Sequence, residues 1–326
     1  MEISTLFADT FDKSFKSAAK SISTPNEVTL FQRLVESIQS LNTPTLNTQT
    51  HNTPLIFGIQ FKVETYHGNR HQVCFSAINS TQMSLNPNRR CELCDLMIIV
   101  YSSKLKLARL TFLQAKYERK KVFYPSSYNW KANLVQWDLL FSRPRIVGCG
   151  KFTPPHDLLQ SALLPSVGSF GFFFRNPDGE FEVFYSSANC LYPKSLRKKE
   201  CRLILSCHNF PYIKNLKTTS GAFDECQIAF GNHLFAKNLY EMNIGTPIGT
   251  PIKETSLTRK WLGKVLRGMK RENQRNDNPS ELSQELLNLI GEEQEGEEVP
   301  SFGARSLIII KNGDGGIVTT ALIPEP

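Results

Sequence analysis

Two apolar runs in the first half of the chain have the pattern of buried β-strands. The run at residues 96–100 follows directly after Asp95, and the run at 110–113 leads into Gln114 and Lys116. Side chains alternate faces along a strand, so Gln114 and Lys116 are expected on one face. If the two strands are neighbours in one sheet, Asp95 meets the Gln–Lys pair at one edge of that sheet.

The polar side chains around these two runs suit a divalent cation and a phosphate. Carboxylate and amide oxygens bind hard cations such as Mg²⁺, and a nearby ammonium group can orient or activate the attacking water. Glu92 precedes Asp95 by three residues and is a further oxygen ligand. The pattern therefore predicts that Asp95, Gln114 and Glu92 bind Mg²⁺ or Mn²⁺, with Lys116 acting on the water.

This arrangement resembles the PD-(D/E)xK, or restriction-endonuclease-like, nuclease superfamily, in the variant with Gln in place of the second acid. Asp95 matches the acid that opens one strand, and Gln114 and Lys116 match the second half of the motif. The family core begins with a helix that often carries a further Glu, and residues 28–41 have helical spacing with Glu36 among them. The resemblance covers under half the chain and implies Asp95, Gln114, Lys116 and Glu36 as the catalytic set.

The same resemblance implies an α/β fold with a restriction-endonuclease-like mixed sheet flanked by helices. The helix and strand that complete this core are expected at residues 130–141 and 145–148. Upstream, the alternating stretches at 54–65 and 72–79 predict a hairpin around residues 66–70.

Further elements are predicted outside this core. Phenylalanines at four-residue spacing within residues 1–24 indicate a helix, and residues 168–185 predict a hairpin whose turn is 176–179. The repeated Ile-Gly-Thr-Pro at 244–251 predicts an extended boundary. Residues 306–323 predict a second, apolar hairpin, which must add to a sheet in this chain or in a partner.

These patterns divide the chain into four expected parts. They are an N-terminal helical segment at 1–24, a nuclease-like core at 25–154, a β-rich extension or recognition region at 155–252, and a C-terminal tail of basic and acidic helices with a terminal hairpin at 253–326.

Charge in the last part is strongly segregated. Residues 253–277 contain eight basic and three acidic residues, whereas residues 278–300 contain seven acidic residues and no basic one. The helix expected at 258–271 is a candidate for binding nucleic-acid phosphates. It is equally suited to dock on the acidic segment, and a solvated surface helix is the third alternative. The candidate nucleic-acid-binding residues are Lys260, Lys264, Arg267, Lys270 and Arg271.

Composition narrows the class of protein. The net charge of +8 is compatible with a polyanionic partner. No apolar run reaches the ~18 residues of a membrane span, and no secretory signal is visible, so a cytoplasmic protein without a membrane partner is expected. No phosphate-binding glycine loop or nucleophile-elbow motif occurs. Eight scattered cysteines, including the pair Cys91 and Cys94, indicate free thiols rather than a zinc site.

The expected function is therefore that of a metal-dependent DNA endonuclease. The family resemblance implies, as context, a bacterial restriction or antiphage defence system. The alternative is a non-catalytic nucleic-acid-binding or assembly subunit that keeps the fold, because Gln114 lacks the charge of the usual acid. DNA is favoured over RNA, and the terminal hairpin is expected to mediate self-association or to dock a partner protein.

Overall fold

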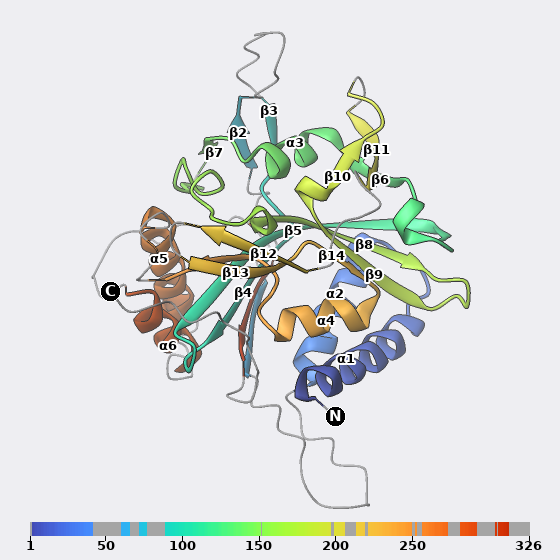
Figure 1. Cartoon of the computed structure of the whole chain (residues 1–326), viewed down its shortest axis with the longest axis horizontal. Coiled ribbons are helices and arrows are strands. Elements are labelled where there is room, and N and C mark those ends of the chain that lie inside the picture. Colours follow the sequence, from blue (N-terminus) through green and yellow to red (C-terminus); the bar gives the residue numbers. More distant parts are fainter. Residues whose placement is uncertain are drawn as a thin grey trace, which may run out of the picture.

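The computed structural model describes most of the chain. The described residues are 2–41, 60–65, 72–76, 89–150, 152–196, 199–205, 213–218, 221–249, 252, 256–272, 281–291, 304 and 306–312. Within them the chain forms a mixed α/β fold in which helices cover a large mixed sheet (Figure 1). The helices are α1 (Ile3–Lys20), α2 (Glu27–Ser40), α3 (Leu134–Ser142), α4 (Asn232–Tyr240), α5 (Ser256–Glu272) and α6 (Glu281–Ile290). None of these helices is long and apolar enough to cross a membrane.

The main sheet contains eight strands in the order β1-β16-β4-β5-β8-β9-β14, with β15 pairing with β5. Its strands are β1 (Gln60–Thr65), β4 (Leu96–Ser102), β5 (Leu107–Lys121), β8 (Gly168–Arg175), β9 (Phe181–Ser187), β14 (Ile228–Phe230), β15 (Thr246–Ile248) and β16 (Ser306–Lys311). The pairs β16–β4 and β5–β8 are parallel, and the other pairs are antiparallel. The sheet thus takes strands from all parts of the chain beyond residue 25.

Three smaller sheets lie outside the main one. Their strands are β3 (Arg89–Glu92), β2 (Gln72–Phe75) and β7 (Ile146–Gly148) in one, β10 (Leu191–Pro193), β11 (Glu200–Leu205) and β6 (Trp130–Asn133) in another, and β12 (Ile213–Thr218) with β13 (Gly221–Cys226) in the third.

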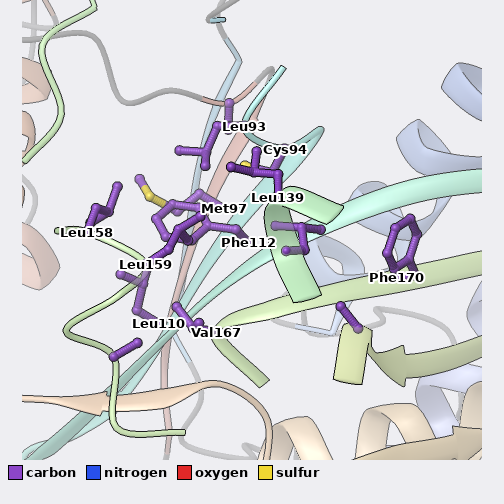
Figure 2. Packing of buried hydrophobic residues seen from close by; sticks show 14 of the residues in the cluster. Leu93, Cys94, Met97, Leu110, Phe112, Leu139, Leu158, Leu159, Val167 and Phe170 are labelled. Carbon is purple, nitrogen blue, oxygen red and sulfur yellow. The ribbon is translucent and has the colours of Figure 1, made fainter. Parts of the chain in front are cut away.

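Each face of the main sheet has its own apolar core, because apolar side chains occupy both faces of β4. Ile98 and its same-face neighbours pack with residues of α1, α2 and α4. Met97 and its same-face neighbours pack with residues of α3, α5, α6 and the smaller sheets. Figure 2 shows residues of this second core, among them Met97 of β4, Phe112 of β5 and Leu139 of α3. Every residue of β4 is buried, which explains why its sequence is a continuous apolar run.

Several sequence predictions are confirmed. Phe7, Phe11 and Phe15 are buried on one face of α1. Strands β8 and β9 form the predicted hairpin, in which the amide of Gly179 donates to the carbonyl of Asn176 at 2.9 Å. Gly179 has φ +86°, a conformation that glycine adopts without the steric cost of a side chain.

The predicted hairpin between residues 54–65 and 72–79 is wrong. Strand β1 pairs with β16, whereas β2 pairs with β3 and β7 in a different sheet. Local alternation identified both strands, but their partners come from distant sequence. The strand predicted at 145–148 is present as β7, also outside the main sheet, and the strand that follows α3 beside β5 is β8.

Part of the repeated Ile-Gly-Thr-Pro segment is extended, as predicted, and residues 246–248 contribute β15 to the main sheet. Gly245 comes so close to β5 that a Cβ atom there would lie 2.7 Å from the carbonyl oxygen of Leu110. Its φ of +90° is also unfavourable for a residue with a side chain. Glycine at this position therefore allows the backbone to pack against β5.

The apolar row of the C-terminal tail is buried within the chain itself. Strand β16 lies between β1 and β4, and Ile308, Ile309 and Ile310 are each at most 3 % exposed. Of the two alternatives that the pattern left open, this strand therefore joins a sheet of its own chain. The second strand of the predicted hairpin, at 316–323, lies outside the described residues.

Candidate active site

The pairing of β4 with β5 brings the three predicted polar residues together. Leu96 lies opposite Leu113, and the amide of Asp95 donates to the carbonyl of Leu113 at 3.1 Å. One step further, the amide of Ala115 donates to Asp95 Oδ2 at 2.9 Å. The Asp95 carboxylate thus accepts the hydrogen bond that a strand carbonyl would accept if the β4 ladder continued. The local fold therefore fixes this carboxylate beside Gln114 and Lys116.

Lys116 lies between two carboxylates. Its Nζ is 4.0 Å from Asp95 Oδ2 and 3.1 Å from Glu27 Oε1. Glu27 belongs to the first turn of α2, which packs on the face opposite to Gln114. The Lys116 side chain is 17 % exposed, so its ammonium group is held near the surface by oppositely charged neighbours. This position suits a group that acts on a substrate arriving from solvent.

Gln114 is fully buried on the face of the second core, opposite Phe170 of β8. Its Nε2 donates to the backbone carbonyl of Glu92 at 3.5 Å. That carbonyl accepts only, so the amide nitrogen must face it and Oε1 must point elsewhere. Among the described residues Oε1 has no hydrogen-bond partner. A buried polar atom without a partner costs about 1–3 kcal/mol and calls for an explanation such as an ion.

The donor set fits a hard cation. Asp95 supplies a carboxylate, Gln114 supplies an amide oxygen, and Glu92 is half-buried at the end of β3. In the described part of the chain, no three His, Cys, Asp or Glu side chains are grouped closely enough to hold a metal. Mg²⁺ keeps several waters and commonly takes only one or two protein carboxylates together with substrate phosphate. The residues present therefore suit Mg²⁺ better than a cation that needs a complete protein cage.

The structure does not bring Glu36 to the other predicted residues. Glu36 is exposed and forms an ion pair with Arg33 on α2. It stands nine residues beyond Glu27, about 13 Å along the helix axis. Sequence reasoning chose the wrong end of α2 because helical spacing alone does not show which turn faces the strand edge. Glu27 replaces Glu36 as the helix-borne acid beside Lys116.

Cys91 of β3 and Cys94, which follows that strand, are both buried. Neither belongs to a disulfide among the described residues. Burial, aided by the nearby Glu92, raises the pKa of Cys91 to about 12. Burial also raises the pKa of Cys94 well above its ordinary value, with Asp95 as the next cause. Both thiols therefore stay protonated near neutral pH.

The predicted basic helix is α5. Its residues Trp261, Val265 and Leu266 are buried in the core. Lys260 is exposed, whereas Lys264 and Arg267 are half-buried. The side chains of Lys270 and Arg271, like the acidic segment at 292–300, lie outside the described residues. Of the three predicted cations whose side chains are described, Lys260 is the exposed one.

Comparison of the chain with protein-family models, curated proteins and solved structures gives no match, so its function has to be argued from the geometry of this site.

Proposed function

We propose that the chain is a Mg²⁺-dependent nuclease that hydrolyses phosphodiester bonds in DNA. The observation that carries the proposal is the buried, unpartnered Oε1 of Gln114 beside the Asp95–Lys116 ion pair. This combination places oxygen ligands and an ammonium group at the same sheet edge. A restriction-endonuclease-like arrangement with a Gln variant of its motif accounts for all three residues.

The order of elements around the site supports the same proposal. Asp95 precedes β4, Gln114 and Lys116 lie on β5, and the chain then passes through α3 to β8, which is parallel to β5. A helix that precedes these strands supplies Glu27. This sequence of an acid-bearing helix, two antiparallel strands, a helix and a further strand is the one that the family resemblance implies.

Each residue has a distinct part in the proposed reaction. When bound, Mg²⁺ supplies Lewis-acid polarisation of the phosphate and a more acidic water. Asp95 and Gln114 would hold the ion through their side-chain oxygens. Lys116 orients the attacking water and stabilises charge on the phosphate through Nζ. Glu27 acts as a positioning residue, because its carboxylate holds that ammonium group at the edge of β5.

A plasmid assay tests the proposal directly. The full chain is incubated with supercoiled DNA in Mg²⁺, Mn²⁺ or EDTA, and nicked and linear products are quantified. Lys116→Ala should abolish cleavage, because the ammonium group acts on the reacting atoms. The control is Lys131→Ala on β6, which removes a lysine that is paired with Glu200 at 2.9 Å, away from the site. Equal activity of the wild type and Lys116→Ala would refute the assignment of the site.

The alternative is a nucleic-acid-binding or assembly subunit without catalysis. Its supporting observation is the neutral side chain of Gln114. The negative charge of Asp95 is then largely balanced by the positive charge of Lys116, which weakens the attraction for a cation. Wild-type protein that binds DNA but does not cut it with either metal would favour this alternative and exclude the nuclease.

A further inference from the structure

Strand β5 continues beyond the candidate site and ends in a basic and aromatic segment. Arg119, Lys120 and Lys121 are exposed, and two residues later the side chains of Phe123 and Tyr124 are 63 % and 75 % exposed. We call these five residues the β5 tip. Adjacent, strongly exposed aromatic side chains are unusual on a surface without a binding role.

The backbone of the β5 tip is held in place by its neighbours. Val122 is buried, and its amide donates to the carbonyl of Arg175 on β8 at 2.8 Å. Lys121 Nζ donates to the carbonyl of Pro177 at 2.9 Å. After Tyr124 the chain enters a short 3-10 helix at Pro125–Ser127. The exposed rings are therefore presented from ordered, packed backbone.

The β5 tip has an excess of positive charge. Glu118, the acid on the same strand, is buried and pairs with Arg202 at 3.0 Å. Among the described residues neither Arg119 nor Lys120 forms an ion pair. Their charges are thus available to a negatively charged partner, which favours a polyanion over an apolar peptide.

We propose that the β5 tip binds single-stranded nucleic acid. Basic residues would contact the phosphates, while Phe123 and Tyr124 stack on unpaired bases. Bases in a duplex already stack on one another, so their faces are open to these rings only where the strand is unpaired. Lys121 lies five residues beyond Lys116, about 16 Å along the strand. A strand bound at the tip would lead toward the candidate site, and this link to cleavage rests on the proposed function.

Binding can be measured separately from cleavage. Fluorescence anisotropy in EDTA with short labelled oligonucleotides of mixed sequence compares single-stranded DNA, single-stranded RNA and duplex DNA. The double variant Phe123→Ala/Tyr124→Ala should weaken single-strand binding at least about tenfold and leave its salt dependence unchanged. Tyr192→Ala on β10, which removes a ring that is 54 % exposed, is the matched control.

The charge contribution has its own signature. Arg119→Ala/Lys120→Ala should reduce the slope of log K against log salt by about 1.4, because two phosphate contacts to a single strand are lost. Lys104→Ala/Lys106→Ala removes two exposed lysines from the turn between β4 and β5, at the other end of β5, and should leave the slope unchanged. Equal affinities for single-stranded DNA and RNA would show that the tip recognises the phosphates and base faces that both share. A higher affinity for one of them would identify it as the preferred ligand.

Three outcomes would overturn the proposal. They are unchanged binding by the aromatic variant, equal losses in the control variants, and losses as large on duplex DNA as on single strands. Absence of binding to every oligonucleotide would likewise reject it in favour of a protein-binding surface. Tip-dependent binding without any cleavage would uphold this inference while the proposed nuclease fails, so the two can be told apart.

Discussion

The carboxylate of Asp95 accepts a hydrogen bond from the backbone amide of Ala115 at 2.9 Å, which ties the candidate catalytic acid to the end of a strand ladder. Asp95 therefore has a structural role in addition to its proposed role in metal binding. Any substitution at this position has to separate the two effects.

Asp95→Asn should separate them. Asparagine keeps an oxygen that can accept from Ala115 but loses the negative charge. We expect it to retain most of the free energy of unfolding while losing Mn²⁺ binding and cleavage. Asp95→Ala also leaves a buried amide unpaired and should cost a further ~1–3 kcal/mol. Urea unfolding and titration calorimetry with Mn²⁺ measure the two effects, and equal unfolding free energies for both variants would contradict the structural role.

Gln114 offers a second separation. Gln114→Glu adds a charge where Oε1 has no partner, so the metal-free protein should lose stability and bind Mn²⁺ more tightly. Gln114→Met removes the unpartnered oxygen and should preserve stability but abolish metal binding. Thermal unfolding with and without Mn²⁺ measures both stability and metal binding, because a bound ligand raises Tm as the ligand concentration increases. A Tm of Gln114→Met that rises with Mn²⁺ as much as that of the wild type would place the metal elsewhere.

Glu27 and Glu36 provide a matched pair of acids on one helix. Glu27→Gln weakens the contact with Lys116 and should reduce cleavage several-fold, because the ammonium group loses its anchor. Glu36→Gln removes only an exposed pair with Arg33 and should leave cleavage unchanged. Both variants should change the unfolding free energy by less than about 1 kcal/mol, as is usual for exposed pairs. Equal activities would show that Glu27 does not position Lys116.

The sequence predicted local features of the site well because they depend on neighbouring residues. The two apolar runs are the neighbouring strands β4 and β5, and Asp95 stands directly before β4, as their patterns predicted. The choice of Glu36 over Glu27 failed because periodicity describes a helix face but not the position of its ends.

Long-range pairings were beyond the same reasoning. The insertion of β16 between β1 and β4 joins segments more than 200 residues apart, and no local pattern in the 60–65 stretch distinguishes β16 from β2 as its partner. The β5 tip was also missed, although its sequence signal, three basic residues close to two aromatics, was present. The sequence did not show that Phe123 and Tyr124 are exposed. The same aromatic residues in a core would pack against other side chains and could not bind a ligand.

The central position of β16 leads to a prediction about the C-terminal tail. Ile309 is fully buried between neighbouring strands, so Ile309→Ala should lower the unfolding free energy by about 2–5 kcal/mol. Val147→Ala, at a side chain that is 67 % exposed, should have little effect and serves as the control. Truncation before residue 304 should expose β1 and β4 edges and cause aggregation. A soluble, cooperatively unfolding truncated chain would show that the sheet does not need this strand.

Glu285 of α6 gives the fold a specific dependence on pH. Its carboxylate accepts hydrogen bonds from Tyr101 and Ser103, and lies 2.8 Å from Lys311 Nζ on β16. Burial acts to raise the pKa of Glu285, but the hydrogen bonds from Lys311 and Ser103 outweigh it and hold the pKa below the ordinary 4.5. A group with a lowered folded-state pKa stabilises the fold above its unfolded-state value, and this contribution is lost as the pH falls through the folded value.

Glu285→Gln should therefore reduce the unfolding free energy at neutral pH, and the difference from the wild type should shrink as the pH falls below 4.5. The gain above that pH comes from the charge of Glu285, which the amide lacks. Urea unfolding at a series of pH values measures this difference. Gln284→Ala, on the exposed face of the same helix, is the control and should show no change in pH dependence. A constant difference between Glu285→Gln and the wild type across the acid range would mean that the carboxylate contributes through packing and not through its charge.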